Sequence, residues 1–299
     1  MMRALQARGY GKSEVQPSPK HDESISTMSG IKQDPYNATV VGREEINPQL
    51  LILRVRPDSN MFDFKPGQFG VLGLLGSAPR VIEATSEETV AEPDKMIRRA
   101  YSIASSSLER RYVEFYLTLI TSGALTPRLF ALAHGSRVFL GAKASGIFTL
   151  DKVAAEKAVV LVATGTGLAP YVSMLRTMLV HDSQRKFVIL HGARYSWDLG
   201  YRGELESLAR LRPNFTYIPS ITRPDQDPHF IGYTGRIQAL MEQGVLERES
   251  GVDLNPAKAE VFLCGNPEMV KVATALLLTK GFAAKGGTDP VTIHVEEYW

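Results

Sequence analysis

The stretch Gly165-Thr166-Gly167-Leu168-Ala169-Pro170 decides the fold of the second half of this chain. The apolar run Ala158–Ala163 precedes it and the helical pattern Tyr171–Leu179 follows it, so the order predicts a buried strand, a glycine turn and a helix. Such a turn binds phosphate, because glycines let backbone N–H groups approach the anion and the helix dipole favours negative charge. Pro170 suits a first helical turn, although it stands where a dinucleotide fingerprint has its third glycine. Two interpretations follow: a nucleotide-binding turn, or a turn that needs glycine only for packing.

The composition is that of a globular protein without a strong net charge. The chain has 299 residues, of which 44% are hydrophobic, and its 34 basic and 32 acidic side chains leave a net charge of +2. This length accommodates two domains, and the near balance of charge argues against a nucleic-acid partner. No apolar run reaches the ~18 residues of a membrane helix. The single cysteine, Cys264, excludes an intramolecular disulfide and a cysteine-held metal cluster, so we expect a cytoplasmic protein with no metal and no membrane contact.

The beginning of the chain differs from the rest. It mixes Lys and Arg with Ser, Gln and Pro, shows no sustained apolar period and lacks the apolar core of a secretory signal. We therefore predict a disordered tail over residues 1–33.

Short strands separated by turns are predicted for the first half. The segments 51–55, 69–72, 112–120 and 137–140 are rich in β-branched, aromatic and other apolar residues. Strands at this spacing favour an antiparallel barrel or sandwich. A long polar stretch with two prolines, Gly76–Arg98, is interpreted as a loop insertion.

After residue 150, strands alternate with helical stretches. The predicted strands cover 187–191, 215–218, 261–263 and 291–295, and the predicted helices cover 204–210, 236–242 and 268–279. Alternation of this kind predicts a parallel sheet with crossover helices.

Four motifs fall at the carboxyl ends of the predicted parallel strands, where doubly wound sheets bind ligands. They are the glycine turn, Gly192-Ala193-Arg194, Thr222-Arg223 and Cys264-Gly265-Asn266-Pro267. Arg194 stands where an acid often binds a ribose hydroxyl, and the planar fork of arginine suits the paired oxygens of a 2′-phosphate. With Arg223 and Arg236 this favours NADP over NAD; the alternative is that arginines are common on solvated helix ends.

Two further motifs suit a large flat cofactor. Arg99-Ala100-Tyr101-Ser102 offers an arginine for a pyrophosphate, an aromatic for a ring and a hydroxyl for a ring heteroatom, although such a triplet also occurs on ordinary strands. The carboxyl end, Glu296-Glu297-Tyr298-Trp299, carries two large aromatics that either cover a flat ligand or pack on the protein's own surface.

These motifs together resemble the ferredoxin–NADP reductases, specifically the bacterial flavodoxin/ferredoxin–NADP reductase branch. The resemblance begins near Ala38 and extends to Trp299, with the motifs in the family's order. Besides those already quoted, they are Lys65-Pro66-Gly67-Gln68-Phe69, Gly123-Ala124-Leu125-Thr126, Ala193-Arg194-Tyr195 and Cys264-Gly265-Asn266-Pro267-Glu268-Met269. The resemblance implies an antiparallel FAD-binding β-barrel over residues 34–150 and a parallel-sheet NADP-binding α/β domain over residues 151–299. The insertion at Gly76–Arg98 is longer than expected for a compact bacterial member.

The resemblance also implies how FAD is bound. Arg99 contacts the pyrophosphate, Tyr101 stacks on the isoalloxazine and Ser102 hydrogen-bonds near its N5. Tyr298 covers the flavin face where nicotinamide stacks, and Trp299 stacks on the adenine. The other implied FAD residues are Ala100, Phe115, Tyr116, Leu117, Ala124, Leu125, Thr126 and Thr166.

For NADP, the hypothesis is that Arg223 and Arg236 bind the 2′-phosphate and that Arg194 assists. Cys264 and Glu296 match positions beside the nicotinamide, and the implied catalytic set is Ser102, Cys264, Glu296 and Tyr298. The full set expected to bind NADP is Gly165, Gly167, Ala193, Arg194, Thr222, Arg223, Arg236, Gly265, Asn266 and Met269.

The implied reaction is hydride transfer between NADPH and the flavin, coupled to one-electron exchange with ferredoxin or flavodoxin. We expect a monomer in which Arg98, Arg128 and Lys143 dock an acidic carrier. Two alternatives stay open: an NAD(P)H reductase that serves an oxygenase or another acceptor, and a non-catalytic protein with a regulatory nucleotide.

Overall fold

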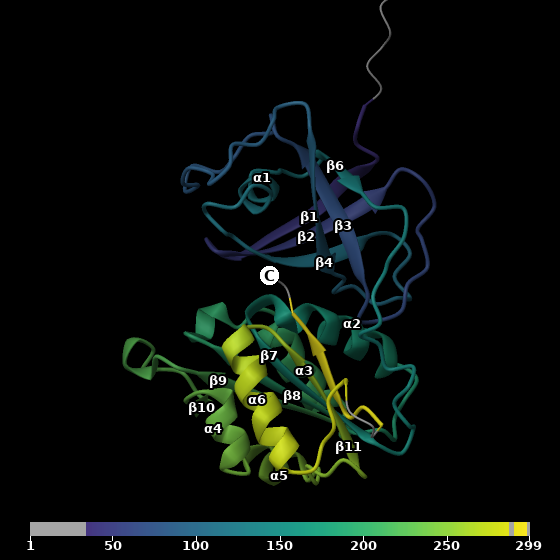
Figure 1. Cartoon of the computed structure of the whole chain (residues 1–299), viewed down its shortest axis with the longest axis vertical. Coiled ribbons are helices and arrows are strands. Elements are labelled where there is room, and N and C mark those ends of the chain that lie inside the picture. The colour runs from purple at the N-terminus through teal and green to yellow at the C-terminus, as the bar shows by residue number, and fades with distance from the viewer. Residues whose placement is uncertain (1–33, 287–289, 298–299) are drawn as a thin grey trace, which may run out of the picture. The chain divides into compact units, whose positions relative to one another are not determined.

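The computed structural model describes residues 34–286 and 290–297. The predicted tail at 1–33 and the predicted roles of Tyr298 and Trp299 fall outside these residues. From Pro35 onward the described chain packs as one compact unit, and it contains two six-stranded sheets (Figure 1).

The first sheet is antiparallel throughout, in the order β4-β3-β6-β1-β2-β5. An isolated bridge between Ile103 and Phe115 joins the segment after β4 to β5 and closes the sheet into a barrel. Leu53, Leu72 and Phe115 are among the fully buried residues of its core. The elements are β1 (Ala38–Asn47), β2 (Leu50–Pro57), β3 (Phe69–Leu75), β4 (Met96–Ser102), β5 (Val113–Thr118), α1 (Thr126–Phe130) and β6 (Arg137–Leu140).

The second sheet is parallel throughout, in the order β10-β9-β8-β7-β11-β12. Helices α2 and α3 pack on one face and α4, α5 and α6 on the other (Figure 1). Its elements are β7 (Ala158–Thr164), α2 (Ala169–Met178), β8 (Phe187–Ala193), α3 (Arg202–Leu211), β9 (Phe215–Ile221), β10 (Tyr233–Thr234), α4 (Ile237–Glu242), α5 (Val245–Ser250), β11 (Ala259–Cys264), α6 (Pro267–Thr279) and β12 (Ile293–Glu296).

This arrangement confirms the predicted fold class, an antiparallel barrel followed by a parallel-sheet α/β domain. The predicted boundary near residue 150 falls between β6 and β7. The insertion is shorter than predicted, because residues 96–98 belong to β4 and pair with β3. The sequence analysis missed β1, whose charged second half is largely solvent-accessible and gives no apolar alternation. It also missed α5, a short helix bounded by Gly244 and Gly251, both with positive φ.

The glycine turn combines the two interpretations that the sequence left open. Thr164 ends β7, a 3₁₀ turn covers Gly165–Leu168, and α2 begins at Ala169 with Pro170 in its first turn. Gly165 has φ +55°, and a Cβ placed on it would meet nothing within 4 Å. A Cβ on Gly167 would lie 2.4 Å from the carbonyl oxygen of Cys264. Gly167 is therefore required for packing against the end of β11, whereas Gly165 faces open space.

This difference gives a stability prediction. Gly167→Ala is expected to lower the free energy of unfolding by about 1–3 kcal/mol or more. The atoms nearest to the new Cβ belong to the backbone of Cys264 and Gly265, which cannot move away as a flexible side chain could. Gly203→Ala is the control: Gly203 lies in α3, where a Cβ, unlike one on Gly167, would meet nothing within 4 Å, and alanine there should stabilise by about 0.4–1 kcal/mol. Urea unfolding of both variants measures the two shifts, and equal shifts would contradict the packing role of Gly167.

No helix in the described part of the chain combines the length and the apolar character needed to cross a membrane. Within residues 34–286 and 290–297, no three His, Cys, Asp or Glu side chains are grouped so that they could hold a metal ion.

Candidate active site

A cavity of about 510 Å³ lies at the carboxyl ends of β7, β8, β9 and β11, within the size range of small-molecule sites. The barrel contributes Gln49, Leu50 and Thr118 to its wall. The α/β domain supplies most of the predicted NADP residues, namely Gly165, Ala193, Arg194, Thr222, Arg236, Asn266 and Met269. The cavity therefore brings together residues that follow four different strands of the parallel sheet.

The floor of this cavity is fixed by the loop after β11. The backbone N–H of Asn266 donates to Thr164 Oγ1 over 2.8 Å, which ties the loop to the end of β7. Asn266 Oδ1 accepts from the backbone N–H groups of Glu268 and Met269, at 3.0 and 3.3 Å, and so caps α6. Gly265 has φ +135°, and its Cβ would lie 2.3 Å from Thr164 Oγ1. The close approach to Thr164 requires glycine at position 265, and the helix cap requires a side-chain acceptor such as that of Asn266.

The three predicted phosphate-binding arginines are exposed but differ in their contacts. Arg236 precedes α4, lines the cavity, and its guanidinium has no hydrogen-bond or ion-pair partner among the described residues. Arg194 also lines the cavity, but it donates to Gln49 Oε1 (3.0 Å) and lies 3.5 Å from Asp198. Arg223 does not line it. Its guanidinium donates to the Tyr195 hydroxyl over 2.7 Å and lies 5.4 Å from that ring's centre.

A stack of aromatic rings holds Arg223 in this position. Tyr195 lies against Trp197, with ring centres 4.5 Å apart and planes 10° from parallel. The Tyr195 hydroxyl also donates to Gln226 Oε1 over 2.7 Å. Arg236 is therefore the arginine whose guanidinium is most available to an anion in the cavity.

His191 was missed by the sequence analysis because an isolated histidine in an apolar strand carries no motif. It is fully buried in β8, one residue before the cavity-lining Gly192. Its Nδ1 lies 3.0 Å from the Tyr217 hydroxyl, and its Nε2 has no hydrogen-bond partner in the described structure. Burial lowers the pKa of His191 to about 3, so the ring is neutral at physiological pH.

Three of the four predicted catalytic residues come together at one point. Ser102 ends β4, and its Oγ lies 3.4 Å from Glu296 Oε2 at the end of β12. Glu296 is paired in register with Cys264, the last residue of β11. Ser102 and Cys264 are buried, and Glu296 is half-buried. The fourth, Tyr298, lies outside the described residues.

The predicted FAD residues of β4 lie on the edge of the barrel. Arg99 and Ala100 are exposed although they lie within a strand, and Arg99 donates to the Arg98 carbonyl over 2.8 Å. Tyr101 packs against the barrel core, and burial raises the pKa of its hydroxyl well above the usual value. This strand thus carries an exposed arginine next to a half-buried aromatic ring.

The other predicted FAD residues are less accessible. Phe115 and Leu117 belong to the barrel core, and the ring of Tyr116 meets Tyr201 edge-on, with centres 5.2 Å apart. Leu125 is buried, and Thr126 Oγ1 accepts from the Ile120 N–H over 3.0 Å. On the other side, Thr166 lies 3.4 Å from Thr118 through their hydroxyls. Phe115, Tyr116 and Leu117 are 0–3% exposed, so in this structure they offer almost no surface to a ligand.

The prediction that Arg128 docks a carrier is wrong. Arg128 is 4% exposed, because the insertion folds over it. Its guanidinium donates to the Gly76 and Ala124 carbonyls and forms an ion pair with Glu87. That hydrogen-bonded pair holds the pKa of Glu87 below its usual range. Of the other two docking candidates, Arg98 is exposed over the ring of Phe139, and Lys143 is exposed.

Comparison with known proteins identifies relatives that match most of this chain. Residues 161–275 match the family described as the oxidoreductase NAD-binding domain. The flavodoxin/ferredoxin–NADP reductase of Escherichia coli (strain K12) is 35% identical over 208 residues, which cover 70% of this chain and 76% of that protein. Ferredoxin–NADP reductase B of Sorangium cellulosum (strain So ce56) is 32% identical over 272 residues, 90% of this chain and 99% of that protein.

A solved structure is similar over both sheets. The crystal structure of a ferredoxin NADP⁺ reductase from Neisseria gonorrhoeae, with bound FAD and NADP, has a TM-score of 0.72 and 26% identity. The match covers 87% of this chain and 97% of that one. By its sequence identity to curated reductases, its motifs and its fold, this chain is an oxidoreductase of the bacterial ferredoxin/flavodoxin–NADP reductase family.

Proposed function

We propose that the protein is an FAD-dependent reductase that transfers electrons between NADPH and ferredoxin or flavodoxin. One observation carries the proposal. The cavity that contains Gly165 and Arg236 is bounded by the loop after Cys264, and Cys264 is paired with Glu296, which contacts Ser102. One short loop, after Cys264, therefore connects the cavity proposed to bind the phosphates with the Ser102–Glu296 pair.

The residues of the barrel edge fit FAD. The exposed Arg99 can bind a pyrophosphate by paired hydrogen bonds, and Tyr101 provides an aromatic surface beside it. When bound, FAD supplies hydride exchange with NADPH and one-electron exchange with a protein carrier. Ser102 would hold or donate a proton at the flavin N5, and Glu296 would accept the hydrogen bond of Ser102.

The cavity residues fit NADP. The open approach to Gly165 lets a phosphate reach the N-terminus of α2, a ten-residue helix. Arg236 would bind the 2′-phosphate at the other end of the cavity, with Arg194 beside it. The carriers are inferred from the names of the relatives, and the exposed Arg98 and Lys143 are the proposed docking cations.

The experiment begins with the purified protein. Its absorbance spectrum should show flavin bands, and the released cofactor should be FAD. Reduction of cytochrome c by NADPH should depend on added ferredoxin or flavodoxin and should be slower with NADH. A protein without flavin would overturn the proposal. Activity only with an oxygenase component would mean that the electron acceptor is that component and not ferredoxin or flavodoxin.

The cofactor preference gives a prediction for Arg236. Arg236→Ala is expected to raise the KM for NADPH by about tenfold or more and to leave that for NADH nearly unchanged, because a charge-assisted contact contributes roughly 1.5–3 kcal/mol. Arg210→Ala, an exposed arginine at the end of α3, is the control and should change neither value. Arg223→Ala, assayed in parallel, measures whether the guanidinium stacked on Tyr195 also contributes. Equal weakening of both nucleotides would show that Arg236 does not bind the 2′-phosphate.

A further inference from the structure

Helix α2 connects the glycine turn to the segment that follows Ser102. Ser173 Oγ donates to the Ser105 carbonyl over 2.7 Å, and Arg176 Nη1 donates to the Ala104 carbonyl over 3.1 Å. One residue further along the helix, Thr177 Oγ1 lies 3.0 Å from Ser106 Oγ and accepts from the Ser107 N–H over 3.1 Å. The helix that begins at the nucleotide turn is therefore hydrogen-bonded to residues 104–107, directly after the predicted flavin strand.

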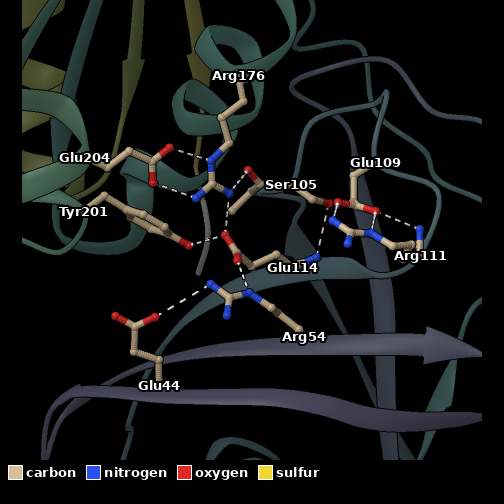
Figure 2. A network of polar contacts seen from close by, with 10 residues as sticks. Glu44, Arg54, Ser105, Glu109, Arg111, Glu114, Arg176, Tyr201 and Glu204 are labelled. Atoms are coloured by element: carbon tan, nitrogen blue, oxygen red, sulfur yellow. Dashed lines mark hydrogen bonds and ion pairs between the residues drawn. The ribbon is translucent and has the colours of Figure 1, made fainter. Parts of the chain in front are cut away.

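A buried carboxylate is at the centre of this contact. Glu114 of β5 is 1% exposed and accepts from Arg176 (2.6 Å), Arg54 (2.6 Å) and the Tyr201 hydroxyl (2.9 Å) (Figure 2). Arg176 also binds both oxygens of Glu204, at 2.7 Å each (Figure 2). Burial opposes the ionisation of Glu114, but the two arginines outweigh it and lower its pKa. We call Glu114, Arg176, Tyr201 and Glu204 the interdomain latch.

The backbone is adapted to this latch. Tyr201 has φ +59°, and it is the one non-glycine residue with positive φ in the described ranges. This unfavourable conformation brings its hydroxyl to Glu114 and its ring beneath Arg176, whose guanidinium carbon lies 5.2 Å from the ring centre. The preceding Gly200 allows the close approach, since a Cβ there would lie 2.2 Å from the Tyr116 hydroxyl. Strain that is kept at such a point indicates a functional constraint.

We propose that Glu114 and Arg176 are positioning residues, which act through α2 and residues 104–107 to set the distance between Ser102 and the glycine turn. The inference rests on the proposed function, because that distance decides how the nicotinamide meets the flavin. Stability alone does not explain the latch, since buried ion pairs are often no more stable than apolar replacements. A displacement of about 1 Å can slow a reaction roughly a hundredfold.

The test uses a charge-balanced double variant, Glu114→Gln with Arg176→Gln, in the FAD-loaded protein. It removes one acid and one base and leaves Arg54 and Glu204. Glu109→Gln with Arg111→Gln is the control. This ion pair lies between β4 and β5, in the same connection as residues 104–107 (Figure 2). The Arg111 side chain is 80% exposed. Flavin reduction by NADPH should slow by about tenfold or more in the latch variant only, whereas reduction by dithionite, which does not need the α/β domain, should keep its rate. FAD and NADP⁺ affinities should stay within about threefold of the wild type, since neither set of binding residues is changed.

A second measurement does not depend on activity. Amide hydrogen exchange at residues 104–107 and 200–204 should accelerate in the latch variant and not in the control. Unchanged exchange, or an unchanged rate with NADPH in a folded variant, would overturn the proposal. If the wild-type protein binds no FAD, the proposed function fails, and the exchange measurement alone then supports or overturns the coupling between α2 and residues 104–107.

Discussion

Ser102→Ala is expected to slow flavin reduction by NADPH about a hundredfold, because a positioned proton donor or acceptor typically contributes that much or more. The hydroxyl is buried at the end of β4, 3.4 Å from Glu296 Oε2, so water does not readily replace it. The loss should appear in the rate at saturating NADPH and not in KM, since Ser102 does not line the nucleotide cavity. Stopped-flow absorbance of the flavin measures both.

The control for this prediction separates chemistry from cofactor retention. FAD content after dialysis should be nearly that of the wild type, since Arg99 and Tyr101 remain. Ser136→Ala changes a serine of similar size in the turn before β6, where its Oγ accepts from the Ala133 N–H, and it should keep the full rate. Glu296→Gln keeps a hydrogen-bond partner for Ser102, so its rate of flavin reduction should lie between those of Ser102→Ala and Ser136→Ala. A Ser102 variant that reduces its flavin at the wild-type rate would exclude the proton role.

The glycine turn was predictable because its elements are local. An apolar strand, two glycines and an apolar helix pattern lie within about twenty residues, and each has a strong intrinsic preference. The same stretch could not distinguish Gly165 from Gly167. That distinction depends on the carbonyl of Cys264, which only the parallel pairing of β11 with β7 brings close. The resemblance predicted that this turn binds the nucleotide, and the structure shows that Gly167 is required for packing whereas Gly165 faces open space.

The wrong prediction for Arg128 has the same origin. A basic side chain is usually exposed, although Arg128 lies among the apolar, buried residues of α1. Its partner, Glu87, comes from the insertion 41 residues earlier. Glu114 and Arg176 are likewise 62 residues apart, and neither belongs to a motif. Long-range polar pairs of this kind have no periodicity, so a single sequence does not reveal them.

Acid is expected to destabilise the protein through His191. Its pKa is about 3 in the folded chain against an ordinary 6.5, so between these values the unfolded chain binds one more proton. The stability present above pH 6.5 is therefore lost as the pH falls toward 3. Over that whole window the loss amounts to roughly 4–5 kcal/mol, from about 1.4 kcal/mol per pKa unit. It should appear in urea unfolding as a free energy that falls steadily with pH in this window.

Variants isolate this contribution from that of the carboxylates. His191→Gln does not titrate and retains a side chain that can hydrogen-bond to Tyr217, so its free energy of unfolding should depend less steeply on pH. His134→Gln is the control, because it makes the same substitution at an exposed histidine. The burial of His191 is a property of β8, whose carboxyl end shapes the cavity wall at Gly192 and Ala193. Parallel curves for His191→Gln and the wild type would mean that His191 has the same pKa in the folded and the unfolded chain, and would contradict the prediction.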